Sequence, residues 1–266
     1  MTARIRAALA AALLIFVATA AAQTRPKVTR IDPPKTLLYV GNSFFYFNDS
    51  MHRIVGGFIA QGDPQNRAQY RQTSVTISGS GLNWHDIEAY FNPGMGSYSF
   101  TADNKVVFNK FDKPFDAVIM NDCSQCPIHP QLKDAFHEFA RKHSQTVVKH
   151  GARPILFMTW AYQDMPEMTA QLAEQYTIAG NANNALVIPA GLAFAKSVAR
   201  NPSINLYYVD KRHPSPAGSY LAAATIYAAL WRKSPAGLGY YDALDPKIAQ
   251  FLQETAWEAV REYYGD

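Results

Sequence analysis

Short apolar runs that each end in a polar turn are the feature that most constrains the fold of this 266-residue chain. Such runs stand at Thr36–Val40, Ala117–Met120, Pro154–Trp160 and Ala185–Ile188. A short, continuous apolar run is typical of a strand that is buried on both faces, as in a parallel sheet. Arg71–Ile77 has the same length but is more polar, so we expect it towards an edge of the sheet.

Helical patterns lie between these runs. Apolar residues recur at helical spacing over residues 136–147, 217–231 and 245–263. Residues 164–178 open with an Asp-Met-Pro-Glu capping pattern, which predicts a helix that starts there. Strands that alternate with helices predict an α/β fold, a three-layer α/β/α sandwich with a central, mostly parallel sheet. No repeat or linker divides residues 35–266, so we expect a single domain there.

The N-terminus of the chain has the form of a secretory signal peptide. Arg4 and Arg6 precede Ala7–Ala22, which is apolar or small with one exception and ends in three alanines. This run falls short of the roughly 20 residues that a membrane-spanning helix needs. We therefore expect residues 1–22 to be removed and the protein to be exported, periplasmic or secreted, with no stable membrane span after cleavage. Residues 23–34, rich in proline, form a short lead-in segment.

The charge balance argues against a nucleic-acid partner. The chain has 25 Lys and Arg and 21 Asp and Glu, and two of the arginines lie in the expected signal peptide. The mature excess is then 23 minus 21, or +2. No basic run or basic patch interleaved with aromatic residues stands out, so neither nucleic acid nor a membrane surface is indicated as a partner.

Polar residues follow the predicted strands at the places where a ligand would bind. In an open parallel sheet, ligands bind outside the carboxyl ends of the strands. Ser43 follows the first run in a Gly-Asn-Ser turn, and Asn121 follows Ala117–Met120. Gly79 directly follows the second strand, with Gly81 as the alternative position for an amide that approaches a ligand. Each of these patterns alone also fits ordinary turn chemistry.

Asp210 and His213 form the most informative pattern. Their spacing of three allows the carboxylate to orient the imidazole on one side of a turn, and Pro214 stiffens the loop. A histidine held in this way can act as a general base.

Together these positions resemble the motif blocks of the SGNH hydrolase superfamily, also called the GDSL-like esterase/lipase group. The resemblance implies a flavodoxin-like fold and a serine esterase. It assigns Ser43 as the nucleophile and His213 and Asp210 as the other triad residues. It assigns the oxyanion hole to the amides of Ser43 and Gly79 and to the side chain of Asn121. This chemistry requires no metal and no organic cofactor.

Two motif blocks depart from the usual pattern. The first carries Asn42 where the commoner form has Asp; Asn42 is not a triad residue, so we expect little mechanistic consequence. The third block lacks the usual Gly-x-Asn-Asp, which leaves Ser124 or Gln125 as alternatives to Asn121 for the oxyanion donor.

Cys123 and Cys126 form a Cys-x-x-Cys pair inside the third block. In an oxidising compartment the pair can close into a local disulfide that staples the loop; free thiols are the main alternative. A thioredoxin-like redox site needs a helix to start at the pair, which Pro127 and Pro130 disfavour. The histidines outside the triad show no paired spacing typical of metal ligands.

Aromatic residues cluster around the expected crevice. Trp160 and Tyr162 follow the fourth strand, and Phe44 opens a run of four aromatics, so we expect these residues to contact substrate. The alternative is that Trp160 caps the core. The expected substrate is a small-molecule or glycan ester, for example O-acetyl groups on a polysaccharide. The alternative function is a non-catalytic glycan-binding or scaffold protein on the same fold.

Overall fold

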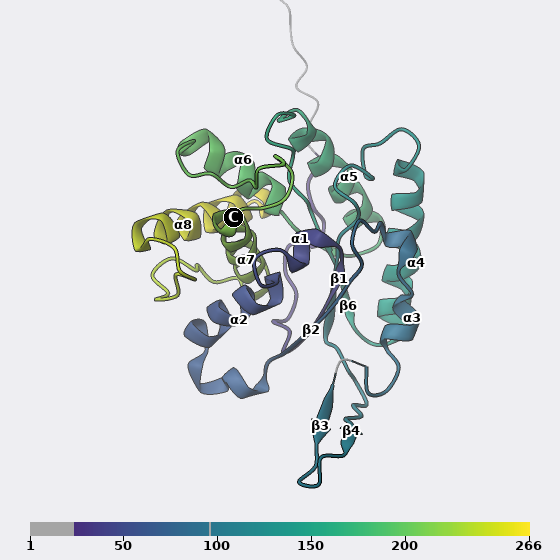
Figure 1. Ribbon diagram of the computed structural model, residues 1–266. Coiled ribbons are helices and arrows are strands. Elements are labelled where there is room, and N and C mark those ends of the chain that lie inside the picture. The colour runs from purple at the N-terminus through teal and green to yellow at the C-terminus, as the bar shows by residue number, and fades with distance from the viewer. Residues whose placement is uncertain (1–23, 96) are drawn as a thin grey trace, which may run out of the picture.

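The computed structural model describes residues 24–95 and 97–266 and contains a five-stranded, all-parallel sheet in the order β2-β1-β5-β6-β7 (Figure 1). The strands are β1 (Thr36–Gly41), β2 (Arg71–Thr76), β5 (Ala117–Met120), β6 (Arg153–Phe157) and β7 (Leu186–Ile188). Each apolar run forms a strand, and the polar strand β2 lies at an edge, as predicted. Counted along the sheet, this is the flavodoxin-like strand order.

Helices cover both faces of the sheet, which confirms the three-layer sandwich (Figure 1). One face carries α1 (Ser43–Tyr46), α2 (Met51–Gly62), α6 (Ala190–Arg200), α7 (Pro216–Trp231) and α8 (Pro246–Tyr264). The other face carries α3 (Ile87–Tyr90), α4 (Lys133–Lys149) and α5 (Met168–Ala182). Two short 3-10 helices, Pro64–Gln69 and Leu82–Trp84, lie in the connections.

Side chains of β1 alternate between two apolar clusters, one on each face of the sheet. Leu37 and Tyr39 belong to the cluster under α2, α7 and α8, and Leu38 and Val40 to the cluster under α4 and α5. Helix α7 is buried on all sides from Gly218 to Trp231, because the sheet, α2 and α8 surround it. The sheet is therefore held rigidly beneath the loops at its carboxyl edge.

The N-terminal predictions lie largely outside the described residues. The expected signal peptide, residues 1–22, is among the residues that the structure does not describe. Residues 24–35 have no helix or strand, and Val28 and Ile31 pack against the core. Over 24–95 and 97–266, the structure contains no helix with both the length and the apolar character needed to cross a bilayer.

The helix expected from residue 164 begins later. Helix α5 starts at Met168, and Asp164 makes no cap. Instead Asp164 pairs with Lys211 at 3.3 Å, and the amide of Met165 donates to the carbonyl of Tyr162. The predicted start of this helix was wrong, because Asp164, the expected capping residue, contacts Lys211 in the Asp210–His213 loop instead.

An antiparallel hairpin that the sequence analysis did not predict projects from the amino end of the sheet, away from α1 (Figure 1). It consists of β3 (Tyr98–Phe100) and β4 (Val106–Phe108). Phe100 is 67% exposed and Phe108 65% exposed. The hairpin and the loops at the carboxyl edge therefore lie at opposite ends of the molecule.

Candidate active site

Ser43 is the first residue of α1, directly after the turn that ends β1. The side-chain oxygen of Asn42 caps this helix by accepting the amide of Phe44 at 3.2 Å. Ser43 is half-buried at the carboxyl edge of the sheet. Its amide belongs to the first helical turn, where N–H groups have no partner within the helix. A ligand at this position can therefore reach both the hydroxyl and the amide.

The loop that carries Asp210 and His213 reaches across to Ser43. His213 Nε2 lies 2.8 Å from Ser43 Oγ, and His213 Nδ1 is hydrogen-bonded to the Asp210 carboxylate. This arrangement fits an imidazole that carries its proton on Nδ1 and accepts the serine hydroxyl at Nε2. The fold thus brings together three side chains that are up to 170 residues apart in the sequence.

Asp210 is held by its own loop. One carboxylate oxygen accepts the amides of Arg212 and His213, each at 3.0 Å. Burial alone would raise the pKa of Asp210, but the hydrogen bonds from the His213 ring and from these two amides outweigh it and lower the pKa. The carboxylate therefore stays ionised and can stabilise a protonated imidazole.

Aromatic rings fix the orientation of the His213 ring. Phe47 stacks on it with centroids 4.2 Å apart, and Phe44 meets it edge-on at 5.8 Å. Trp160 stacks on Phe44 at 4.5 Å and donates its Nε1 hydrogen to the carbonyl of Arg212 at 2.9 Å. These rings brace both the histidine and the loop that carries it.

The prediction that Trp160 and Phe44 contact substrate is wrong. Trp160 is 0% exposed and lies stacked between Phe44 and Phe194, so it supports the site from behind. Tyr162 is also buried, and its hydroxyl lies 2.6 Å from Ser124 Oγ. Stacking and hydrogen bonding, which residue type alone does not reveal, turn these side chains inward.

Tyr162 lines a cavity of about 620 Å³ between α6 and residues 202–207. Phe194 lines the same cavity, so the stacked ring of Trp160 stands between it and Phe44 beside Ser43. The residues that line this cavity do not include Ser43 or His213.

The turn that follows β2 lies beside α1. Tyr46 donates its hydroxyl to Ser78 Oγ at 3.0 Å, which holds the turn against the helix. Gly79 adopts a φ of +71° on the exposed side, a conformation that favours glycine. Gly81 is buried, and a Cβ there would lie 2.7 Å from a carboxylate oxygen of Asp122. Of the two glycines, Gly79 is the one that presents an amide on the open side of the turn.

The side chain of Asn121, the predicted side-chain oxyanion donor, is engaged inside the fold. Its side-chain amide donates to Asn42 Oδ1 at 3.2 Å, and the residue is buried. Its oxygen lies against Gly41, where a Cβ would come within 1.5 Å. Asn121 comes directly after β5 and therefore lies beside Gly41, the last residue of the neighbouring strand β1.

Ser124 and Gln125, the alternatives to Asn121, lie half-buried in the same loop, and Ser124 is bound to Tyr162. The amides of Ser43 and Gly79 have no protein acceptor within residues 24–95 and 97–266. These two amides are therefore the donors that remain free for an oxyanion.

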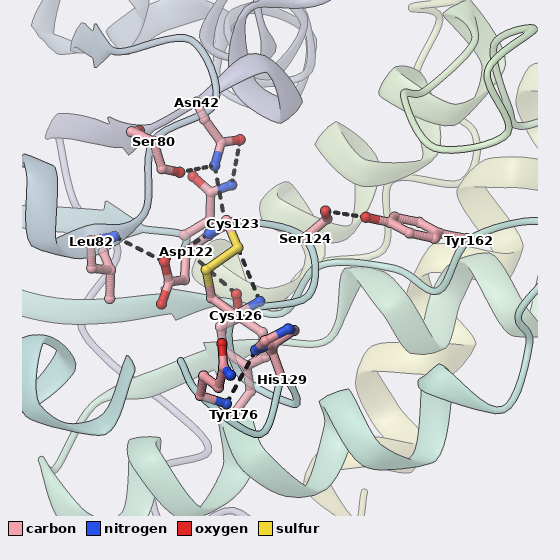
Figure 2. The surroundings of a disulfide bond; sticks show 12 residues. Asn42, Ser80, Leu82, Asp122, Cys123, Ser124, Cys126, His129, Tyr162 and Tyr176 are labelled. Carbon is pink, nitrogen blue, oxygen red and sulfur yellow. Dashed lines mark hydrogen bonds between the residues drawn. A yellow bond between two sulfur atoms is a disulfide. The ribbon is translucent and has the colours of Figure 1, made fainter. Parts of the chain in front are cut away.

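A buried carboxylate and a disulfide hold the third block (Figure 2). Asp122 accepts the amides of Leu82 at 2.9 Å and Cys123 at 2.8 Å. Burial raises the pKa of Asp122 to about 6 and outweighs the lowering effect of these two amides. Cys123 and Cys126 are joined in a disulfide that closes the loop.

In the described part of the chain, the one group of possible metal ligands consists of Asp122, Cys123 and Cys126. Their ligand atoms lie within 4.8 Å of one another. Because the two sulfurs are bonded to each other, they offer no thiolate to a metal.

Sequence reasoning missed the contributions of Asn42 and Phe47. An Asn between a strand and a helix is a capping signal, so the helix cap at Asn42 could have been predicted. The stacking of Phe47 on His213 joins distant segments, and no local pattern indicates it.

The comparisons with known proteins identify the fold. Neither family models nor curated protein sequences give a match. Among solved structures, a DUF4886 family protein from Bacteroides uniformis is 17% identical, with a TM-score of 0.56, covering 85% of this chain and 94% of the other. A protein from Slackia heliotrinireducens that has been assigned to the SGNH hydrolases is 21% identical, with a TM-score of 0.53, covering 73% and 98%.

A third similar structure is an acetylxylan esterase from Geobacillus stearothermophilus, studied as a catalytic mutant. It is 14% identical, with a TM-score of 0.51, and the match covers 81% of this chain and 99% of that one. The chain therefore has the fold of the SGNH hydrolases, as the sequence motifs predicted.

Proposed function

We propose that this protein is an exported serine esterase that hydrolyses carboxylic esters. The observation that carries the proposal is the continuous hydrogen-bonded chain from Ser43 Oγ through His213 to Asp210. The free amides of Ser43 and Gly79 beside it, and a fold shared with SGNH hydrolases, support the same conclusion.

In the proposed reaction, Ser43 Oγ attacks the ester carbonyl while His213 Nε2 takes its proton. The carbonyl oxygen becomes an oxyanion, which the amides of Ser43 and Gly79 stabilise. His213 then gives its proton to the leaving alcohol as the ester bond breaks, which leaves an acyl group on Ser43. Water, activated by the same histidine, releases the acid and restores the hydroxyl. Asp210 keeps the imidazole in the required tautomer throughout.

O-acetyl groups on a polysaccharide are the substrate class that we propose. The His213 and Asp210 side chains are 27% and 37% exposed, so a bulky polymer can approach without a deep pocket. An acetyl group needs little space, which suits a site that is not part of the large cavity lined by Tyr162. The structural similarity to an acetylxylan esterase is consistent with this class.

A fluorophosphonate probe tests the proposal, because it labels only an activated serine. We expect the wild-type protein to be labelled and to hydrolyse p-nitrophenyl acetate, and Ser43→Ala to lose both activities. Ser203→Ala, at an exposed serine far from Ser43 in the sequence, is the matched control and should behave as wild type. Circular dichroism should show that all three proteins are folded.

Release of acetate from an acetylated glycan then tests the substrate class. A folded wild-type protein with neither labelling nor turnover of acetyl to octanoyl esters would contradict the proposal. If that protein still bound glycan, and Ser43→Ala bound it equally well, the rival scaffold function would be favoured.

A further inference from the structure

Asn42 is hydrogen-bonded to three of the loops that surround the site. Its Oδ1 accepts the amide of Phe44 and the side-chain amide of Asn121, each at 3.2 Å. Its Nδ2 donates to the carbonyl of Ser80 at 2.9 Å and to the carbonyl of Asp122 at 3.1 Å. Figure 2 shows Asn42 above the loop of Asp122 and Cys123, with Ser80 alongside. One side chain thus joins the loops that follow β1, β2 and β5, which are neighbours in the sheet.

The hydrogen-bonding capacity of this side chain is used in full. A primary amide offers two donor hydrogens and two acceptor lone pairs, and the four contacts occupy all of them. Asn42 is only 4% exposed, so none of these bonds is exchanged freely with water. The residue therefore has nothing left to offer a substrate, and its role is to hold other groups.

The groups that Asn42 holds are adjacent to the two proposed oxyanion donors. Asn42 binds the amide of Phe44, and the Ser43 amide lies one residue before it. Asn42 also binds the carbonyl of Ser80, and the Gly79 amide lies one residue before that residue. Ser80 is tied a second time, because its hydroxyl donates to the carbonyl of Gly41 at 3.2 Å. A shift of about 1 Å in a positioned group can lower a rate about a hundredfold, so the spacing of these amides matters.

The contacts require an amide at position 42 in this chain. Two carbonyl oxygens, of Ser80 and Asp122, face the side-chain nitrogen. An aspartate has the same shape but only accepts hydrogen bonds, so it would face these oxygens with no hydrogen to share. The motif alone predicts little mechanistic consequence for Asn42, because it does not show these contacts between loops.

We propose that Asn42 is a positioning residue of this site: its side-chain amide sets the separation between the Ser43 and Gly79 amides and so determines how well they stabilise the oxyanion. The proposal rests on the esterase function proposed above.

Steady-state kinetics of Asn42→Asp on p-nitrophenyl acetate tests it. We expect kcat to fall about a hundredfold, the usual effect of losing one oxyanion donor, with KM changed less than threefold. If Asn42 had only a structural role, the variant would have a lower Tm but would not show a selective fall in kcat at nearly constant KM.

Asn183→Asp is the matched control. Asn183 is half-buried after α5 and donates to the carbonyl of Ala179 at 2.8 Å, at the other edge of the sheet. The control should keep wild-type kcat and KM even if its Tm falls.

If Asn42→Asp does not fold, Asn42→Ser replaces it, because serine keeps a capping oxygen for α1 but cannot reach the two carbonyls. The same selective loss of kcat is expected. Wild-type kcat in the folded variant would overturn the inference, as would an equal loss in the Asn183 control. An inactive wild-type protein would instead contradict the esterase function, so the two failures are distinguishable.

Discussion

The site has two halves that differ in exposure. The triad half is open: the His213 and Asp210 side chains are 27% and 37% exposed. The other half, which we call the frame, consists of Asn42, Asn121 and Asp122, and all three are buried. The comparison teaches that the groups proposed to react must meet substrate, whereas the groups that set the loop positions must be kept from water and from motion. We therefore expect substitution of Asp210 to lower the rate directly, and substitution of Asp122, which is not hydrogen-bonded to a proposed oxyanion donor, to change stability.

The largest effect is expected in the triad half, for Asp210→Asn. The variant loses the carboxylate that selects the reactive imidazole tautomer, so kcat should fall roughly 10⁴-fold. Tm should change little, because Asp210 is well exposed and its pairing with His213 is screened by solvent. Ester hydrolysis and thermal unfolding monitored by circular dichroism measure the two properties. A loss of less than tenfold would show that the open half does not work as a triad.

A smaller effect, on stability rather than rate, is expected in the frame for Asp122→Asn. Burial raises the folded-state pKa of Asp122 from 3.8 to about 6, so the folded protein holds this proton more tightly than the unfolded chain. The bound proton therefore stabilises the folded state. This stabilisation, about 3 kcal/mol, is fully present below pH about 4 and is lost as the pH rises through about 6. The Asn variant keeps the acceptor for Leu82 and Cys123 without this cost.

The free energy of unfolding of the two proteins, measured by denaturant titration from pH 4 to pH 8, checks this prediction. The wild type should become progressively less stable than the variant up to pH about 7, and kcat should stay within threefold. A pH-independent difference would mean that Asp122 does not ionise within the frame.

The smallest effect is expected outside both halves, in the β3–β4 hairpin. Phe100→Ser with Phe108→Ser changes two side chains that are largely exposed at the opposite end of the molecule (Figure 1). The free energy of unfolding should stay within about 0.5 kcal/mol of wild type, and kcat on a soluble ester within twofold. A marked loss of rate would show that the site depends on more than the two halves compared above.

Local patterns predicted the strands of the parallel sheet well. The runs at Thr36–Val40 and Ala117–Met120 form buried strands because burial on both faces selects continuous apolar sequence. The triad residues could be proposed because Asp210 and His213 stand three residues apart and because the blocks that carry them and Ser43 resemble those of the SGNH hydrolases.

The failures concern contacts between distant segments. The type of Asn121 suggests an oxyanion donor but does not reveal that its side chain is bound to Asn42 and lies against Gly41. Trp160 looks like a binding residue, yet Phe44 and Phe194 enclose its ring. Neither outcome follows from local sequence, because each depends on which loops the sheet order brings together.

The sequence by itself determined the alternation of strands and helices and the residues at the carboxyl edge, since periodicity and turn chemistry are local properties. Only the tertiary structure decided which of those residues face outward and which form the buried frame. The physical reason is that a buried polar side chain is shielded from water and must turn towards the hydrogen-bond partners that the surrounding protein offers. For Asn42, those partners come from three different loops.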